Sequence, residues 1–165
     1  MARKIRQSKD MRGFTLVELI VVVVLLAVVA AVVIPQAISS ADFQAVSGAR
    51  LVASDLQYAQ NVAITAQSPV TVTFYPAGRS YSLTDYRSQP LIHPITKSAY
   101  TVNFAAQRGF ERLGIVSASF GGAAAVTFDE LGSPSNAGTV VLRAGPHTYR
   151  IEVAASTGKV TVTVQ

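Results

Sequence analysis

A run of 21 residues at positions 14–34, FTLVELIVVVVLLAVVAAVVI, contains one ionisable side chain, Glu18, and its last 16 residues are all apolar. As an α-helix the run would span about 32 Å at ~1.5 Å per residue, which matches a hydrocarbon core of about 30 Å. A carboxylate within such a segment costs a few kcal/mol, so Glu18 is either functional or an acid tolerated near the helix start. The run therefore predicts a membrane-spanning helix and disfavours a wholly soluble fold.

The 13 residues before this run are basic. They contain one acid, Asp10, and five basic residues: Arg3, Lys4, Arg6, Lys9 and Arg12. This local charge of +4 makes up most of the formal charge of +5 of the whole chain. Because the basic flank of a membrane helix stays in the cytoplasm, we expect a cytoplasmic N-terminus and a C-terminal part on the far side of the membrane. The high isoelectric point is then weak evidence for a nucleic-acid partner.

Two other interpretations of the N-terminal segment are open. A cleaved secretory signal peptide has an apolar stretch of about 7 to 15 residues. The stretch here is longer, although small residues could imitate a cleavage site at Ala37, Ser39, Ser40 and Ala41. A plain signal anchor fits the length and the basic flank, but it gives Glu18 no role.

Residues 36–67 have the pattern of an amphipathic helix. Apolar side chains recur every three or four residues, at Ile38, Ala41, Ala45, Ala49, Val52, Leu56, Ala59, Ala63 and Ala66. This seam is rich in alanine, so a sheet can approach it closely. Gly48 should weaken the helix interior by about 1 kcal/mol, and Gln67-Ser68-Pro69 should end the helix. If the chain stays helical through Pro35, this segment and the apolar run form one rod.

After Pro69 the apolar period changes to two, with β-branched and aromatic residues between turn signals. We predict strands at residues 70–75, 80–85, 99–104, 124–129, 139–144, 148–153 and 159–164. Residues 87–97 read as a proline-bearing loop, and residues 108–120 are ambiguous between a further strand and a loop. The predicted fold class is therefore α+β, with one long N-terminal helix packed on an antiparallel β-sheet domain.

Motifs for catalysis or cofactor binding are missing from the sequence. There is no cysteine, and the two histidines, His93 and His147, have no metal-ligand spacing. No nucleophile elbow or phosphate-binding loop occurs. The adjacent acids Asp129 and Glu130 lack the supporting acids of a Ca²⁺ loop, so a solvated turn is the simpler interpretation. We expect no enzyme activity, no cofactor and no metal site.

The segment Gly13-Phe14-Thr15-Leu16-Val17-Glu18, with the apolar run behind it, resembles the N-terminal signature of type IV pilins and type II secretion pseudopilins. This resemblance implies that prepilin peptidase cleaves after Gly13 and methylates the new amino group of Phe14. In this family the acid at the fifth mature position, here Glu18, is thought to pair with the N-terminal ammonium of a neighbouring subunit, which would neutralise both charges. Pro35 stands where these proteins commonly have a proline that loosens or kinks the helix.

The rest of the chain is similar to the GspH/FimT family, the H-type pseudopilins of type II secretion and FimT-like minor pilins. The similar residues are Arg50, Leu51, Asp55, Leu56, Ala59, Ala63, Ile64, Thr157, Gly158 and Lys159. Gln60-Asn61 departs from relatives that often carry charged residues there. The resemblance implies a cleaved leader (1–13), a transmembrane and assembly helix (14–35), an amphipathic helix (36–68) and a periplasmic β-domain (69–165), with the helix packed on two β-sheets.

The resemblance implies a structural subunit of a type II secretion pseudopilus, anchored in the bacterial inner membrane before assembly. Its implied partners are other pilin or pseudopilin subunits, the prepilin peptidase and the inner-membrane assembly platform. One alternative is a minor type IV pilin involved in pilus assembly or DNA uptake, with Arg143, Arg150 and Lys159 as candidate DNA contacts. Ordinary solvent-facing charge is the simpler explanation of these three residues. Another alternative is a single-pass periplasmic protein that is never processed.

Overall fold

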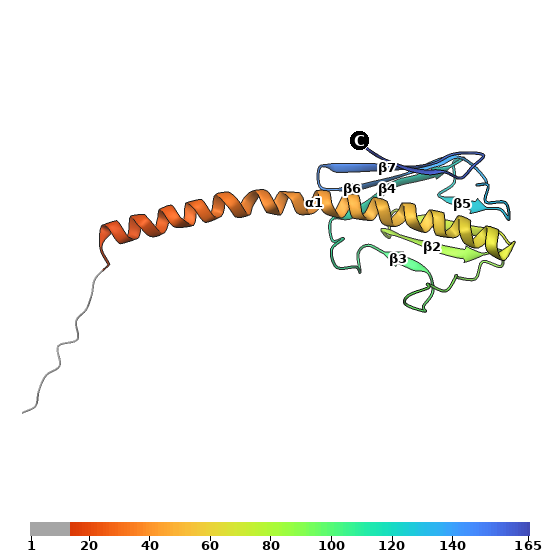
Figure 1. The fold of residues 1–165 in the computed structure, drawn as a ribbon, viewed down its shortest axis with the longest axis horizontal. Coiled ribbons are helices and arrows are strands. Elements are labelled where there is room, and N and C mark those ends of the chain that lie inside the picture. Colours follow the sequence, from red (N-terminus) through yellow and green to blue (C-terminus); the bar gives the residue numbers. More distant parts are fainter. Residues whose placement is uncertain (1–13) are drawn as a thin grey trace, which may run out of the picture. The chain divides into compact units, whose positions relative to one another are not determined.

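The computed structural model describes residues 14–165, without the side chains of residues 32–40. In this part of the chain one helix, α1 (Leu16–Ala66), precedes eight strands (Figure 1). They are β1 (Val70–Tyr75), β2 (Ser80–Asp85), β3 (Thr101–Asn103), β4 (Leu113–Phe120), β5 (Ala125–Phe128), β6 (Gly138–Ala144), β7 (His147–Val153) and β8 (Val160–Val164). The chain divides into two compact units, residues 1–37 and 38–165.

Local signals explain where α1 begins and ends. At its start the side-chain oxygen of Thr15 accepts a hydrogen bond from the backbone N–H of Glu18 at 3.2 Å, which is an N-cap. At its end Gln67 has a φ of 47°, and the N–H of Ser68 donates to the carbonyl of Ala63 at 3.1 Å. This is the hydrogen bonding of a Schellman motif, here with glutamine in the left-handed position. The predicted end of the helix at Gln67-Ser68-Pro69 is confirmed.

The strands form two four-stranded antiparallel sheets, with strand orders β3-β2-β1-β5 and β4-β6-β7-β8. The consecutive pairs β1–β2, β2–β3, β6–β7 and β7–β8 are antiparallel neighbours. In the β6–β7 hairpin Ala144 lies opposite His147 around the turn at Gly145 and Pro146. The seven predicted strands are confirmed, with ends that shift by at most two residues. The ambiguous segment 108–120 contains a turn followed by β4. The α+β prediction is confirmed as well.

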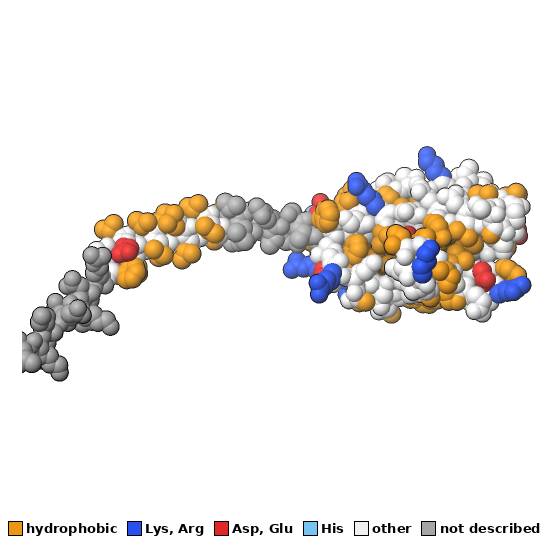
Figure 2. Space-filling view, turned by 60° about the horizontal axis from the view of Figure 1, so that its bottom comes forward, with side chains coloured by type: hydrophobic (Ala, Val, Ile, Leu, Met, Phe, Trp, Pro, Cys, Tyr) orange, Lys and Arg blue, Asp and Glu red, His pale blue; other side chains and the backbone are white. Residues whose placement is uncertain are grey.

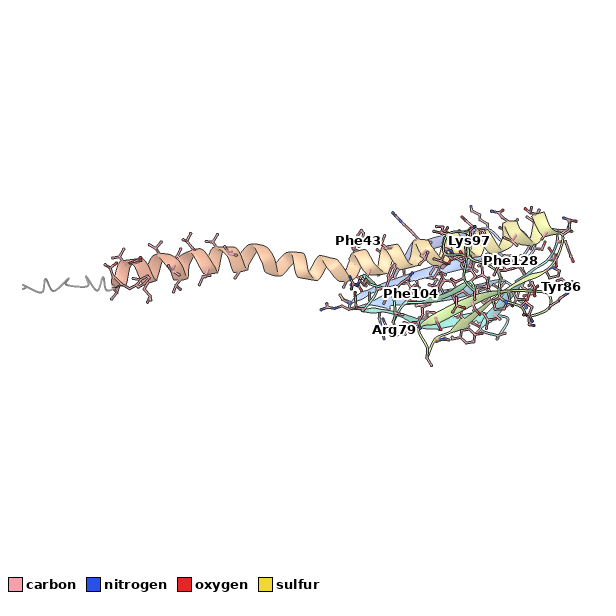
Figure 3. All side chains as sticks on the ribbon, turned by 90° about the horizontal axis from the view of Figure 1, so that it is seen from below. Phe43, Arg79, Tyr86, Lys97, Phe104 and Phe128 are labelled. Carbon is pink, nitrogen blue, oxygen red and sulfur yellow. The ribbon has the colours of Figure 1, made fainter. Side chains whose placement is uncertain are left out.

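The buried face of α1 packs on both sheets. Its residues that are at most 3% exposed are Ala41, Ala45, Ala49, Val52, Leu56, Ala59 and Ala63. All of them except Ala41 share one core with inward strand residues such as Leu83 and Leu142 and with Phe104 and Phe128 (Figure 3). The predicted seam is wrong at Ala66, which is exposed because the chain turns towards β1 there. The side chain of Ile38 lies outside the described residues.

Gly48 is needed where the helix approaches β4 most closely. A Cβ atom at this position would overlap with the Cδ2 atom of Leu113, which is fully buried in the core. Leu113 has little room to move, because protein interiors are packed as densely as organic crystals. The sequence predicted only the weakening of the helix by Gly48, and the structure shows the close packing that accompanies it.

Candidate functional site

The N-terminal part of α1 is apolar on every side. Phe14 is 79% exposed, and the large apolar side chains from Leu16 to Val29 are 46–74% exposed. A helix that is hydrophobic all round is normally buried, in a protein core, in a membrane or among other helices. Exposed apolar surface of this extent marks a site of contact with lipid or protein. We call the described residues 14–31 the apolar helix surface.

Glu18 is the charged residue of the apolar helix surface. It lies at the third position of α1, where a carboxylate interacts favourably with the helix dipole. The next basic residue along the chain is Arg50, 32 positions later. Within the described range 14–165, no basic residue therefore lies near Glu18 in the sequence.

Other predicted residues of this segment lie outside what the structure describes. Gly13 and the rest of the basic leader precede the described range, and the side chain of Pro35 is among those not described. The expected loosening of the helix at Pro35 therefore stays a prediction. Among the side chains described, which leave out 32–40, no helix is both long enough and apolar enough to cross a membrane.

A buried carboxylate links α1 to the first sheet. Asp55 is 5% exposed, and its two oxygens accept hydrogen bonds from the hydroxyls of Tyr81 at 2.6 Å and Tyr100 at 3.1 Å. Burial raises the pKa of Asp55, although both hydrogen bonds act in the opposite direction. The ring of Tyr100 also packs against Tyr58 and His93, with centroid distances of 5.4 and 4.5 Å. This cluster joins the helix, β2 and the segment before β3.

In the sequence, Asp55 stands out only as a residue shared with the GspH/FimT family, and its role in joining helix and sheet was not predicted. The available signal was its spacing, because Asp55 lies three residues after Val52 and four before Ala59, on the apolar seam itself. An acid at such a position must have hydrogen-bond donors when it is buried. Which side chains supply them depends on the pairing of helix and sheet, which the sequence pattern does not contain.

Gln60 joins the other end of α1 to two turns. Its Nε2 donates to the carbonyl of Gly132 at 2.8 Å, in the turn between β5 and β6, and to the carbonyl of Thr157 at 2.9 Å, in the turn between β7 and β8. Gly132 and Gly158 have positive φ and lie directly against this side chain. The departure from the family pattern at Gln60 therefore has an internal, structural use.

Replacing Gln60 by alanine should lower the free energy of unfolding by about 1–2 kcal/mol, because two turn carbonyls lose their donor. The neighbouring Asn61 is exposed, so Asn61→Ala is a matched control. We expect this substitution to change the free energy of unfolding by less than ~0.5 kcal/mol. Urea unfolding of the full chain in a non-ionic detergent, followed by tyrosine circular dichroism, measures both. Equal effects of the two substitutions would contradict the assignment.

The three candidate DNA contacts occupy one sheet but lie far apart on it. Arg143 is opposite Thr148 in the β6–β7 pairing, whereas Lys159 is opposite Ala154. Thr148 and Ala154 are six residues apart along the same strand direction, so Arg143 and Lys159 are separated by about 20 Å at ~3.3 Å per residue. Arg150 lies between them, and its guanidinium is 3.9 Å from the carboxylate of Glu152. Lys159 shares a hollow with Glu152, and Arg143 lines a different one. The DNA contacts stay a prediction.

The acids and histidines set aside in the sequence have local partners. The Oδ1 atom of Asp129 accepts hydrogen bonds from the N–H groups of Leu131 and Ser133 at 3.0 and 2.7 Å, which forms an Asx turn. The Nδ1 atom of His93 accepts from two backbone N–H groups of its own loop, and His147 lies 3.5 Å from Asp42. The described residues contain no cluster of three or more potential metal ligands.

Two family models match the chain. The prokaryotic N-terminal methylation motif matches residues 8–34, and type II transport protein GspH matches residues 48–158. The first match contains Glu18 and the apolar run, and the second contains most of the helix–sheet core. A search of curated proteins found no match.

Solved structures share the fold. The minor pseudopilin EpsH from the type 2 secretion system of Vibrio cholerae is 11% identical, with a TM-score of 0.54 over 73% of this chain and 97% of that chain. The type IV minor pilin FimU of Pseudomonas aeruginosa is 14% identical, with a TM-score of 0.53 over 74% of this chain and 90% of that chain. Identities this low establish a common fold and no more.

Proposed function

Because this chain belongs to the family of type II transport protein GspH, we propose that it is a minor pseudopilin, a structural and non-enzymatic subunit of a type II secretion pseudopilus. The observation that carries the proposal is the presence, in one chain, of an N-terminal methylation motif, an apolar helix surface and a GspH domain. The first two features serve membrane anchoring and helix bundling, and the third forms the outer domain.

Processing is the first step of the proposed function. Prepilin peptidase removes residues 1–13 on the cytoplasmic side and methylates the amino group of Phe14. The methylation motif spans this junction, since it covers residues 8–34. Cleavage removes the basic leader but keeps the apolar run, so the mature chain stays in the inner membrane with its β-domain in the periplasm.

Assembly then replaces lipid around the apolar helix surface with the helices of other subunits. The small side chains of Ala27, Ala30 and Ala31 allow other helices to pack closely, and such packing drives association where lipid and protein are equally apolar. Glu18 is the residue that this step must neutralise. We assign its partner as the N-terminal ammonium of the neighbouring subunit, because two opposite charges in a low dielectric stabilise each other only as a pair. The assembly platform of the inner membrane extracts the subunit.

N-terminal mass spectrometry of the chain purified from its native membrane tests the proposal. We expect a mature chain that begins with N-methylated Phe14. A strain lacking prepilin peptidase is the control and should retain the leader. A chain that still begins at Met1 in the presence of the peptidase would exclude processing, and with it the pseudopilin function.

A further inference from the structure

A hollow of about 280 Å³ lies at the end of the β-domain where α1 enters it. Arg79, Arg112, Arg143 and Glu111 line it. Two contacts show which part of α1 lies beside the hollow. A Cβ atom added to Gly145, which lines the hollow, would lie 3.4 Å from the Cβ atom of Ala41. The side chain of Gln44 accepts a hydrogen bond from the backbone N–H of Arg112 at 3.0 Å. Figure 3 likewise shows Arg79 at the end of the domain near Phe43, with Tyr86 at the opposite end. We call this the arginine hollow.

The arginine hollow is rigid on one side. The Arg79 side chain donates through Nε and Nη2 to the carbonyls of Leu113, Phe110 and Glu111, which holds its guanidinium in place. The Glu111 carboxylate accepts from the N–H of Gly109 at 2.9 Å and from Nε2 of Gln44 at 3.4 Å, and the hydrogen bond from Gly109 lowers its pKa. Three guanidinium groups and one carboxylate leave the lining with a net charge of +2.

Arg112 and Arg143 are exposed, and neither has an acidic partner within salt-bridge distance in the described part of the chain. Figure 2 shows Lys and Arg side chains at this end of the domain, and others along its length and at its opposite end. The opposite end differs, because Asp85, Asp129 and Glu130 lie near the end of α1 at Ala66. Arg87 and Lys159 also lie at that opposite end, so basic side chains there are accompanied by acids, whereas Arg112 and Arg143 have no acid among the described residues within salt-bridge distance.

Apolar side chains accompany the arginines. Val116, in the hollow, lies at a bulge of the edge strand β4 and is 48% exposed, and Phe43 is 72% exposed at the same end of the domain. Cations beside exposed apolar groups suit the boundary between phosphate headgroups and acyl chains. The chain supplies the proximity, because Ala41 follows Ile34 by seven residues, at most about 25 Å even when fully extended.

We propose that the arginine hollow binds the phosphate of an anionic phospholipid in the membrane that anchors the same chain. This inference rests on the proposed function, since it needs residues 14–34 to lie in the bilayer. Docking would hold the β-domain at the periplasmic surface of the membrane until assembly extracts the subunit. Each exposed arginine near an anionic surface should favour the docked state by roughly fivefold.

The full chain tests the proposal in reconstituted vesicles. It has no cysteine, so Val116→Cys creates a single labelling site for a fluorophore at the hollow. A lipid with a spin label on its headgroup then quenches the fluorophore when the domain is docked. Vesicles of phosphatidylcholine alone are compared with vesicles that also contain phosphatidylglycerol. We expect strong quenching only in the vesicles that contain phosphatidylglycerol. High salt should weaken this quenching, because it screens the attraction between the arginines and the anionic lipid.

Two double variants remove equal charge from opposite ends of the domain. Arg112→Gln with Arg143→Gln should shift the docking equilibrium by roughly 25-fold and abolish the added quenching. Arg87→Gln with Lys159→Gln should leave it unchanged. Equal quenching in both kinds of vesicle, or equal loss in both double variants, would overturn the proposal. A fluorescence change on adding inorganic phosphate to the chain in detergent would identify a free-phosphate site and overturn the lipid assignment.

Vesicle flotation separates this inference from the proposed function. A chain that fails to float with the vesicles lacks the membrane anchor, and both proposals fail. A chain that floats but shows no dependence on phosphatidylglycerol overturns the docking alone and leaves the pseudopilin function standing.

Discussion

Substituting Glu18 by alanine is expected to reduce assembly into sheared pseudopili by about a hundredfold or more, and to stop secretion. Removal of one member of a buried ion pair leaves the other charge uncompensated, at a cost of about 3–5 kcal/mol. In the pairing that we propose, the charge left behind is the ammonium of Phe14 in the neighbouring subunit. Immunoblots of sheared fibres and of secreted protein measure the effect, and mass spectrometry checks that Phe14 is still exposed and methylated.

A matched substitution separates charge pairing from helix capping. Glu18 lies in the first turn of α1, where Thr15 caps the helix by accepting from the Glu18 N–H. Thr15→Val removes this cap, worth about 1 kcal/mol, and keeps the carboxylate. We expect Thr15→Val to assemble nearly normally and Glu18→Asp to retain part of the function. Wild-type assembly of Glu18→Ala would refute charge pairing, and an equal loss in Thr15→Val would assign Glu18 to the helix start. Loss of pili with normal secretion would favour the minor type IV pilin alternative.

Removing the buried carboxylate of Asp55 should have the largest effect on the stability of the β-domain. Asp55→Ala leaves the hydroxyls of Tyr81 and Tyr100 without an acceptor at positions that are 0% and 3% exposed. An unsatisfied buried donor costs about 1–3 kcal/mol, so we expect a loss of about 3 kcal/mol in the free energy of unfolding. Urea unfolding of the full chain in detergent measures this loss.

The same residue predicts a pH dependence. Burial raises the pKa of Asp55 above its value of about 3.9 in the unfolded chain, so the folded state binds the proton more tightly. The tighter proton binding of Asp55 therefore adds to the free energy of unfolding. This contribution is fully present below pH ~4 and is lost as the pH rises through the pKa of Asp55 in the folded state. Asp55→Asn keeps the shape of the side chain and removes the titration.

The free energy of unfolding of the wild type minus that of Asp55→Asn should therefore be larger at about pH 4 than at pH 7. The lowered pKa of Glu111 acts in the opposite direction, but it is common to both proteins and cancels in the difference. A difference that rises with pH would show that ionised Asp55 is the better partner of Tyr81 and Tyr100, against the predicted sign. A difference that does not change with pH would mean that its pKa is not raised.

Local pattern was enough to predict the elements of this chain. Strands such as β1 and β2 have their predicted ends because each alternates apolar and polar residues between glycine or proline turns. The helix ends after Ala66 because Pro69 follows closely and Gln67 accepts the left-handed conformation. These are short-range properties of the backbone and of side-chain period, which are readable without a partner.

Contacts between distant segments were beyond the same pattern. Asp55 and Tyr100 are 45 residues apart, and Gln60 and Thr157 are 97 apart, so neither pair has a sequence signal. The separation of Arg143 from Lys159 is a similar case. The two residues are 16 positions apart in the sequence, on the first and third of three consecutive predicted strands, and the pairing of β6, β7 and β8 places them at opposite ends of the sheet.

Charge and hydrophobicity along a single segment, residues 1–34, are enough to predict the membrane-directed part of this protein: a basic segment followed by an apolar helix that contains one acid, Glu18. Folding of residues 38–165 was needed for the rest. It selected the donors to Asp55, the use of Gly48 and the grouping of Arg79, Arg112 and Arg143, because each depends on the strand register and helix packing that bring remote residues within a few ångströms. Short-range chemistry predicts the anchor, and long-range packing forms the surface of the folded domain.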